Sequence, residues 1–402
     1  MSSVLPRAPA AAAGSDAAPP APLAIYVHIP YCVRKCGYCD FNSYERAGEQ
    51  ETSRYLAALR QEMERVAQDP AVARRPVVSV FVGGGTPTVL TGGQLALVLG
   101  QLRQLFSLAP DAEVTSEANP GTVDAEKLAE MRQAGYNRLS YGAQARQDHL
   151  LRTLGRIHQA GDVEEGVRLA RQAGFTNLNL DLMYGLPGQT LADWDETLRW
   201  AIDLGPEHIS AYSLIIEEGT PFAALHSRGL LALPGEDADL AMDRRALDSL
   251  QAAGLEAYEI SNYARPGCRS RHNQVYWRNE EYLGFGAGAH GFSSGVRSWN
   301  LRRPQDYARA LLEEDRLPVA GSETPDEATS MGETMMLGLR LRDGVAFGRF
   351  RARFGHDLRD VYAAPLVKLA GLGLLEESTT AVRLTERGRL LGNQVFAEFL
   401  PE

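Results

Sequence analysis

The chain has 402 residues, of which 44% are hydrophobic and 23% charged, and its formal net charge at pH 7 is −10. At about 150 residues per domain, this length predicts two to three domains, or one barrel with an appendage. The composition excludes a largely disordered chain. The acidic net charge disfavours a general binder of nucleic acid or anionic membranes. The sequence also lacks the roughly 18-residue apolar run of a transmembrane helix.

Residues 1–22 are built mostly from Ala, Pro, Ser and Gly, with Arg7 as their only basic residue. A secretory signal needs a basic start and a strongly apolar stretch, and an organelle transit peptide needs several arginines. We interpret the segment as a disordered tail. A cytoplasmic location with reduced thiols is therefore expected.

Strand-like and helix-like segments alternate after the tail. Strands are expected at residues 23–29, 77–82, 113–117, 138–144, 175–182 and 208–216. Apolar residues at helical spacing follow at 52–66, 95–106, 125–134, 163–173, 194–204 and 240–253. Such repeats predict a parallel sheet with helices outside, and both a doubly wound sheet and a barrel fit. Six units rather than eight would leave a barrel open on one side, which suits a large substrate.

Polar or glycine-rich residues follow the first five predicted strands, where α/β proteins place their chemistry. After the first strand come three cysteines and after the second comes GGGTPT, while Glu117, Gln144 and Asp181 mark the next three. The sequence therefore predicts one site built from several strand ends.

The pattern changes beyond residue 255. Residues 256–324 read as a connecting segment, and 325–402 as a mostly helical domain with a short strand at 382–384, similar to a winged helix. Between residues 343 and 402 there are eight basic and eight acidic side chains. This balance offers no electrostatic footprint for phosphates, so nucleic-acid binding is not expected.

Three of the four cysteines, Cys32, Cys36 and Cys39, lie within eight positions. Three thiolates on one loop can hold three corners of an iron–sulfur cube and leave one iron open. A closed zinc site needs a fourth ligand, usually from a second pair, and no such pair is evident. His28 lies on a predicted strand and is expected to pack there, and Cys268 is interpreted as a buried or idle thiol.

The CxxxCxxC motif, with Tyr38 before its last cysteine, resembles the radical S-adenosylmethionine (SAM) superfamily. The resemblance implies a partial (β/α)6 barrel over residues 23–255, followed by the mostly helical, winged-helix-like domain. It also implies a [4Fe–4S] cluster on the three cysteines, with SAM bound to the open iron. The residues that it places around SAM are Tyr26, Tyr38, Gly84, Gly85, Thr86, Glu117, Gln144, Arg156 and Asp181.

Within that superfamily the chain resembles the haem chaperones most closely, through YVHIPYCVRKCGYCDF, FVGGGTPT, DLMYGLPGQT and RHNQVYW. The related coproporphyrinogen III oxidases carry a further cysteine where this chain has Phe41, and an N-terminal extension where its first strand starts near residue 23. The resemblance implies binding of haem, transfer of haem to acceptor proteins, and no coproporphyrinogen III oxidase activity. Oxidative decarboxylation of coproporphyrinogen III is the alternative, a zinc-stabilised binding module is a third reading, and a homodimer stays open.

The RHNQVYW stretch matches the HNxxYW motif of these chaperones and supplies the candidate haem residues His272, Asn273, Tyr276 and Trp277. His272 could ligate iron, the two aromatic rings could lie against a porphyrin, and Arg269, Arg271 or Arg278 could meet the propionates. The alternative is that the motif only packs a loop against the barrel. His290 is the rival iron ligand.

Overall fold

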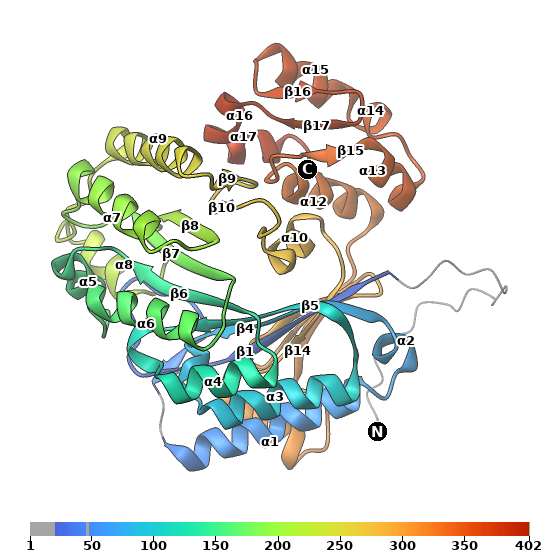
Figure 1. Ribbon diagram of the computed structural model, residues 1–402. Coiled ribbons are helices and arrows are strands. Elements are labelled where there is room, and N and C mark those ends of the chain that lie inside the picture. The colour runs from blue at the N-terminus through green and yellow to red at the C-terminus, as the bar shows by residue number, and fades with distance from the viewer. Residues whose placement is uncertain (1–20, 46–47, 402) are drawn as a thin grey trace.

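The computed structural model describes residues 21–45 and 48–401, so all but the last two positions of the predicted tail lie outside the described residues. Six parallel strands form the centre of the fold (Figure 1). They are β1 (Leu23–Ile29), β4 (Pro76–Gly84), β5 (Ser107–Ala118), β6 (Arg138–Gln144), β7 (Leu178–Tyr184) and β8 (His208–Ser213). The sequence predicts all six, β1 and β6 at their observed bounds.

Each strand pairs with the next in this order. The first strand therefore lies at one end of these six strands instead of in their middle. A doubly wound sheet reverses its strand order at a switch point, so the open barrel is the alternative that the structure confirms.

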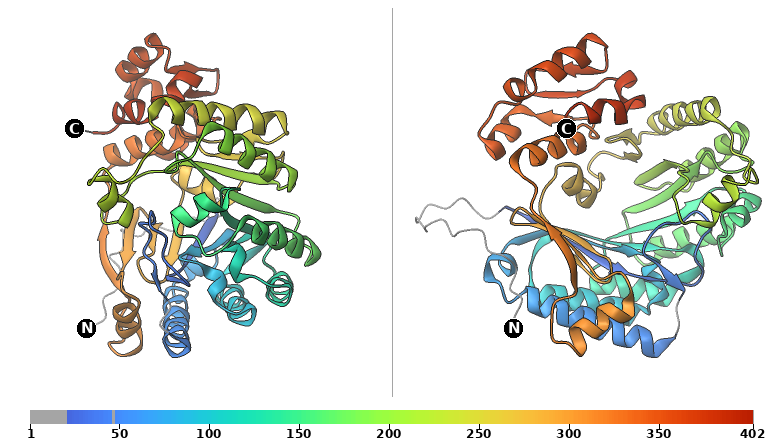
Figure 2. Two further views of the ribbon diagram at one scale, coloured as in Figure 1. Left: turned by 90° about the vertical axis from the view of Figure 1, so that its left-hand side faces the viewer. Right: turned by 180° about the vertical axis from the view of Figure 1, so that it is seen from behind.

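The connecting helices cover the outer face of the sheet (Figures 1 and 2). The longer ones are α1 (Glu49–Val66), α3 (Gly92–Leu105), α4 (Ala125–Ala134), α6 (Ala160–Gln172), α7 (Leu191–Asp203) and α9 (Glu236–Ala252). Shorter elements are α2 (Pro70–Ala73), α5 (Asp148–Leu154), α8 (Pro221–His226) and the 3-10 turns η1 (Pro87–Val89) and η2 (Pro120–Thr122). Alternate strand residues such as Ile25, Val80 and Leu180 are fully buried against these helices and form the main core.

Residues 256–324, read from the sequence as a connection, extend the sheet at both ends. β9 (Glu256–Ala257) and β10 (Asn262–Ala264) add antiparallel strands beside β8, and β11 (Tyr282–Phe285) pairs in parallel with β1. β12 (His290–Ser293), β13 (Val296–Asn300) and β14 (Val319–Glu323) continue as an antiparallel ribbon. The result is a 12-stranded sheet running from β14 to β9, with α11 (Pro304–Leu312) beside α1.

The C-terminal domain lies across the sheet from α1, α3 and α4 (Figure 1). Its helices are α12 (Glu327–Gly338), α13 (Phe347–Phe354), α14 (Leu358–Val361), α15 (Ala363–Gly371), α16 (Glu386–Leu390) and α17 (Gly392–Ala397). A small sheet, β15 (Val345–Ala346), β17 (Ala381–Leu384) and β16 (Leu375–Glu377), completes it, and a separate apolar core around Phe350 and Leu369 holds it together.

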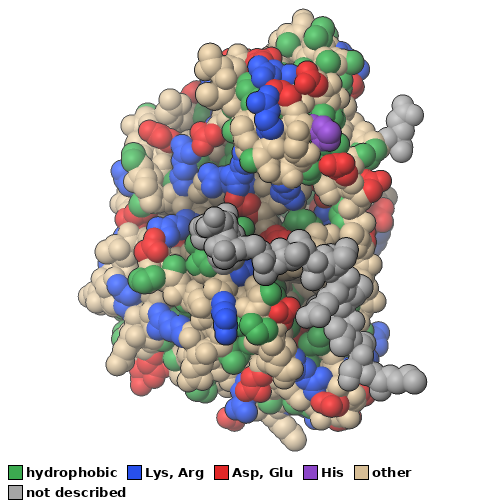
Figure 3. Space-filling view, turned by 90° about the vertical axis from the view of Figure 1, so that its right-hand side faces the viewer, with side chains coloured by type: hydrophobic (Ala, Val, Ile, Leu, Met, Phe, Trp, Pro, Cys, Tyr) green, Lys and Arg blue, Asp and Glu red, His purple; other side chains and the backbone are tan. Residues whose placement is uncertain are grey.

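Lys and Arg side chains on the face drawn in Figure 3 lie among Asp and Glu. Most of these groups can therefore be screened by a neighbour of opposite sign. Among the described residues, no helix is both long enough and apolar enough to span a bilayer.

Candidate functional site

The inner face of the sheet, turned away from the connecting helices, is lined by polar side chains. Successive strand residues face opposite sides, so residues in register across the strands form rows on one face. One such row consists of His28, Gly83, Glu117, Ser140, Asn179 and His208. A sheltered polar surface of this kind is typical of a ligand site and not of an apolar core.

The cysteine loop leaves the barrel after β1, at the carboxyl end of the parallel strands. The loop begins with β2 (Tyr31–Cys32) and ends with β3 (Tyr44–Glu45), and these two short strands pair with each other. Gly37 lies in the middle, where its amide donates to the Leu154 carbonyl at 3.2 Å and its own carbonyl accepts from the Phe222 amide at 3.0 Å. These bonds fasten the loop to the end of α5 and the start of α8.

The three thiols lie close enough together to influence one another. Burial raises the pKa of Cys32 and of Cys39, and the neighbouring thiols raise them further. Among the described residues, no three Cys, His or carboxylate side chains stand at metal-binding spacing.

The glycine-rich turn after β4 is packed tightly against the start of the cysteine loop. The Gly85 and Thr86 amides donate to the Ile29 and Tyr31 carbonyls at 2.8 and 2.7 Å. The Thr86 hydroxyl donates to Cys32 Sγ at 3.6 Å. A Cβ on Gly85 would lie 2.5 Å from the Tyr31 oxygen, so the approach itself requires glycine.

Gly84 is constrained by a neighbouring side chain. Its φ is +113°, and a Cβ there would lie 2.5 Å from the His28 ring. The missing side chain therefore makes room for His28, which in turn lies 2.9 Å from the Tyr26 hydroxyl and 2.8 Å from the Asn42 carbonyl oxygen. His28 packs on its strand, as expected.

Glu117 reaches this turn from the end of β5. Its carboxylate accepts the Gly84 amide at 3.0 Å. Burial and the nearby Asp181 charge raise the pKa of Glu117 to about 7. A half-buried carboxylate with so few partners is suited to a ligand that brings donor groups, such as an ammonium or ribose hydroxyls.

Gln144 and Arg156 meet at the end of β6. A Cβ on Gly142 would contact both side chains, within 2.8 Å of the Arg156 guanidinium and 3.2 Å of the Gln144 amide. Arg156 donates to the Gly142 carbonyl at 2.7 Å and to Cys36 Sγ at 3.6 Å. Gln144 Oε1 and Arg156 Nε are buried without a hydrogen-bond partner, and Gln144 has a φ of +62°. Unsatisfied polar atoms and a strained backbone beside the cysteine loop indicate a ligand site.

Asp181, on β7, is held in place by its neighbours. Ser140 donates to it at 2.9 Å, and Asn179 does so at 2.9 Å. Burial raises the pKa of Asp181, and these hydrogen bonds oppose the rise. The sequence did not single out Ser140 or Asn179, although Asn179 lies two residues before Asp181 and Ser140 lies four residues before Gln144.

The two tyrosines pack against different aromatic rings. Tyr26 lies on the inner face of β1, with its ring 6.3 Å from that of Phe81. Tyr38 packs against Phe222 of α8 at 6.3 Å, and burial raises its pKa despite the nearby Arg156.

The HNxxYW motif forms α10 (Arg271–Trp277), which lies against the inner face of β4. His272 is only 1% exposed. Its Nδ1 lies 3.0 Å from the Ser79 hydroxyl and its Nε2 lies 2.8 Å from the Tyr276 hydroxyl. Its ring also stacks on Phe81 at 5.2 Å. Neither nitrogen of His272 is free to reach a metal in this arrangement.

The remaining motif residues join α10 to its surroundings. The Asn273 amide donates to the Ser270 hydroxyl at 3.2 Å, which caps the helix. The Trp277 ring lies under the Arg340 guanidinium at 4.7 Å, and this contact connects the barrel to the C-terminal domain. Two proposed propionate partners are already paired, Arg269 with Asp343 and Arg271 with Asp111.

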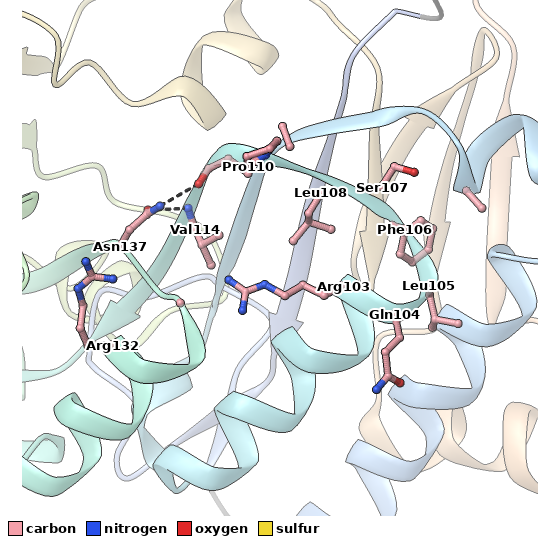
Figure 4. A pocket seen from close by; sticks show the side chains of 14 residues that line it. Arg103, Gln104, Leu105, Phe106, Ser107, Leu108, Pro110, Val114, Arg132 and Asn137 are labelled. Atoms are coloured by element: carbon pink, nitrogen blue, oxygen red, sulfur yellow. Dashed lines mark hydrogen bonds between the residues drawn. The ribbon is translucent and has the colours of Figure 1, made fainter.

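A cleft of about 790 Å³ lies away from the cysteine loop, at the opposite end of the central strands (Figure 4). Arg103 and Arg132 reach its edge from the ends of α3 and α4. Both are already bonded to main-chain carbonyls, Arg103 to Ala134 and Arg132 to Gly174. These arginines hydrogen-bond carbonyl groups at helix ends, so we interpret the cleft as a gap between structural elements and not as a ligand site.

Two family descriptions match the chain. Residues 26–201 match the radical SAM superfamily, and residues 326–391 match the HemN C-terminal domain. The second match falls on the separate domain described above.

Relatives cover nearly the whole chain. The chain is 41% identical over 378 residues to the heme chaperone HemW of Bacillus subtilis, which spans 94% of this chain and 99% of that protein. It is 38% identical over 387 residues to HemW of Escherichia coli, spanning 95% and 99%. Among solved structures, coproporphyrinogen III oxidase (HemN) from Escherichia coli, a radical SAM enzyme, superimposes with a TM-score of 0.81 at 25% identity over 94% of this chain and 90% of that one.

Proposed function

This chain belongs to the radical SAM superfamily, in the group of the heme chaperone HemW, and we propose that it binds haem, one [4Fe–4S] cluster and SAM, and delivers haem to acceptor proteins. The identity to HemW relatives along the full chain carries the proposal, since it reaches 41% while identity to the oxidase is 25%. The thiols of the cysteine loop suit a reducing compartment, and we place the protein in the cytoplasm.

Cys32, Cys36 and Cys39 would hold the cluster. They share one loop, which the α5 end and α8 fasten to the barrel. A cluster held by three thiolates supplies an iron with an open coordination position. The chain's own part is to present three sulfurs, with Thr86 donating to one of them and Arg156 to another.

SAM would lie along the strand ends beside that loop. Arg156 and Gln144 offer unsatisfied polar atoms for its carboxylate and amino groups. Glu117 and Asp181 are acceptors for an ammonium or hydroxyls, and Gly85 and Thr86 shape the turn between them. Tyr26 and Tyr38 would contact the flat parts of the ligand.

The second candidate function is oxidative decarboxylation of coproporphyrinogen III, which the HemN superposition favours. Phe41 argues against it. This side chain is 59% exposed at the rim of the cysteine loop, at the position of the oxidase's additional cysteine. An exposed phenyl ring offers an apolar contact surface and no thiol chemistry.

Anaerobic reconstitution separates these functions. We expect about four irons and four sulfides per chain with a broad visible absorption, stable haem binding, and transfer of that haem to a haem-free acceptor. With coproporphyrinogen III, SAM and a reductant, we expect no protoporphyrinogen IX. Steady turnover would support the oxidase, and a zinc content without iron would support the binding module.

A further inference from the structure

The eight histidines of the chain separate into two groups by exposure. His28, His158, His208 and His272 are buried, whereas His149, His226, His290 and His356 are exposed. A protein that transfers haem to another protein needs an iron ligand that is accessible from solvent, so that haem can bind and dissociate while the protein stays folded. The buried group fails this requirement, and His272 fails it with both ring nitrogens occupied.

His290 differs from the other exposed histidines in its position. It lies on β12, opposite Trp299 on β13. Tyr282 pairs with Phe292, two residues along from His290, so His290 shares the inner face of the sheet with Tyr26 and Tyr282. Of the four exposed histidines, His290 alone stacks on an aromatic ring within the described part of the chain.

The imidazole of His290 is oriented by stacking on Trp299, while its two nitrogens are left without hydrogen bonds in the described part of the chain. Its ring centroid lies 5.9 Å from that of Trp299 with an interplanar angle of 25°. The indole rests on bare backbone, since a Cβ on Gly321 would lie 2.4 Å from it. Within the described residues, neither His290 ring nitrogen makes a hydrogen bond.

The charges around His290 favour its neutral imidazole, and they leave a cation nearby for the carboxylates of a bound haem. Burial, Arg297 and Arg302 lower the pKa of His290. Arg297 is paired with Glu323 and Glu333, so its charge is already balanced. Arg302 is exposed and has no ion-pair partner among residues 21–45 and 48–401. It remains available for an anionic group such as a haem propionate.

The strand that carries His290 is held beside the cysteine loop. The Asn42 amide donates to the Ala287 carbonyl at 3.0 Å and to the Arg302 carbonyl at 2.8 Å. Asn42 thus connects the loop to the chain on both sides of the β12–β13 ribbon. Its neighbour Phe41, which is exposed, lies at the same rim and presents an apolar ring.

We propose that His290 is the axial ligand of the haem cargo, with its ring plane set by Trp299, Arg302 facing a propionate and Phe41 contacting the macrocycle. The bond forms by donation of an imidazole nitrogen lone pair to iron, without electron transfer. Trp299 lies nearly parallel to the imidazole, so it fixes the ligand ring and meets the porphyrin only at an edge. The inference rests on the proposed haem binding and specifies its site.

The first test titrates haem into the full-length, cluster-loaded protein and follows the Soret band and magnetic circular dichroism. His290→Ala should lose the imidazole-ligated spectrum and raise Kd about tenfold or more. Millimolar free imidazole should restore the spectrum. His149→Ala, another exposed histidine, should match the wild type. An unchanged spectrum in His290→Ala would overturn the site, whereas a wild type that binds no haem would overturn the proposed function with it.

The second test concerns the propionates. Arg302→Gln should weaken haem binding a few-fold, and haem dimethyl ester should bind this variant and the wild type equally, because the ester lacks the anionic group. Arg303→Gln removes the adjacent exposed arginine and should leave haem affinity unchanged. Equal losses for haem and its ester in Arg302→Gln would show that Arg302 does not face a propionate.

Discussion

The guanidinium of Arg156 lies 3.6 Å from the sulfur of Cys36, so a cation that follows α5 stands beside the middle cysteine of the loop. The same group donates to the Gly142 carbonyl at 2.7 Å and keeps its Nε unpartnered. The Arg156 side chain thereby joins the cysteine loop to the end of β6, and it places a cation beside the loop.

Arg156→Leu should weaken SAM binding about tenfold or more, because an aliphatic side chain offers no donors to a carboxylate. Arg156→Lys should recover only part of the affinity, since lysine lacks the planar pair of donors. Calorimetry on cluster-loaded protein measures both, with Arg152→Leu on the exposed side of α5 as the control. Equal SAM affinity in Arg156→Leu and the wild type would remove Arg156 from the site.

Single Cys→Ser changes at positions 32, 36 and 39 should each abolish the visible absorption of the reconstituted cluster, because a cube with two protein thiolates is poorly held. Cys268→Ser should keep full absorption, since Cys268 follows β10, outside the cysteine loop. Absorption and iron analysis check both statements. A loss of iron in Cys268→Ser would show that this thiol serves the cluster.

Gly84→Ala should destabilise the fold by about 2–4 kcal/mol, since the new Cβ would add backbone strain and a clash with the His28 ring. Gly188 has a φ of +76°, and a Cβ added there would meet no atom within 4 Å. Gly188→Ala should therefore cost only about 1–2 kcal/mol of backbone strain. Urea unfolding compares the two, and similar losses would contradict the role of His28.

The contribution of Glu62 to stability should fall as pH rises from about 5 to 8. Buried histidines such as His158 and His272, whose pKa burial lowers, contribute in the opposite direction over part of the same range. Burial raises the pKa of Glu62 from 4.5 to about 7, against hydrogen bonds from Tyr307, Gly286 and Asn300 that lower it. The folded state therefore keeps this proton after the unfolded chain has released its own. The stabilisation is complete at acid pH and is lost as pH rises through about 7, a change of about 3 kcal/mol for this group.

Glu62→Gln should remove this contribution, because the amide does not titrate in this range, so the stability advantage of the wild type over the variant should fall by about 3 kcal/mol between pH 5 and 8. Glu117, whose pKa burial also raises to about 7, should contribute a fall of the same sign in both proteins. Glu64→Gln, on the exposed side of α1, is the matched control and should leave the slope unchanged. Denaturant unfolding at several pH values measures it, and parallel profiles for Glu62→Gln and the wild type would exclude this origin.

Trp277→Leu should loosen the C-terminal domain by about 1–2 kcal/mol, because the Arg340 guanidinium loses the ring that it covers at 4.7 Å. Faster amide exchange should appear in α12 and α13 while the barrel strands stay protected. Trp200→Leu, on the outer helix α7, should not change exchange in that domain. Uniform exchange changes across the chain would indicate a general loss of stability instead.

The parallel strands and the shared loop of the three cysteines could be predicted because their signals are local. Runs such as residues 23–29 are short and apolar, and Cys32, Cys36 and Cys39 lie in one loop. The β12–β13 ribbon was missed because its strands are four and five residues long and carry Gly291, Ser293 and polar Arg297, without a clear alternation.

Tertiary structure also decides that His272 is buried and His290 is exposed. Both occur in distinctive stretches of sequence, and nothing in those stretches indicates which ring is enclosed. Enclosure of His272 follows from Ser79 and Phe81 on a strand almost 200 residues earlier, which the helix of the HNxxYW motif covers. Sequence periodicity predicts on which face of its helix or strand a residue lies. It does not predict which other element packs against that face.

Asn42 and Arg302 are 260 residues apart in the chain, and β1 pairs with β11 at a similar separation. Contacts between such distant segments form late in folding, and during synthesis they cannot form until the second partner has left the ribosome. Until then one edge of β1 has no neighbour and the cysteine loop lacks its support from Asn42. The cysteine loop is thus made early and enclosed late, which leaves a period in the life of each chain when the loop is open on one side.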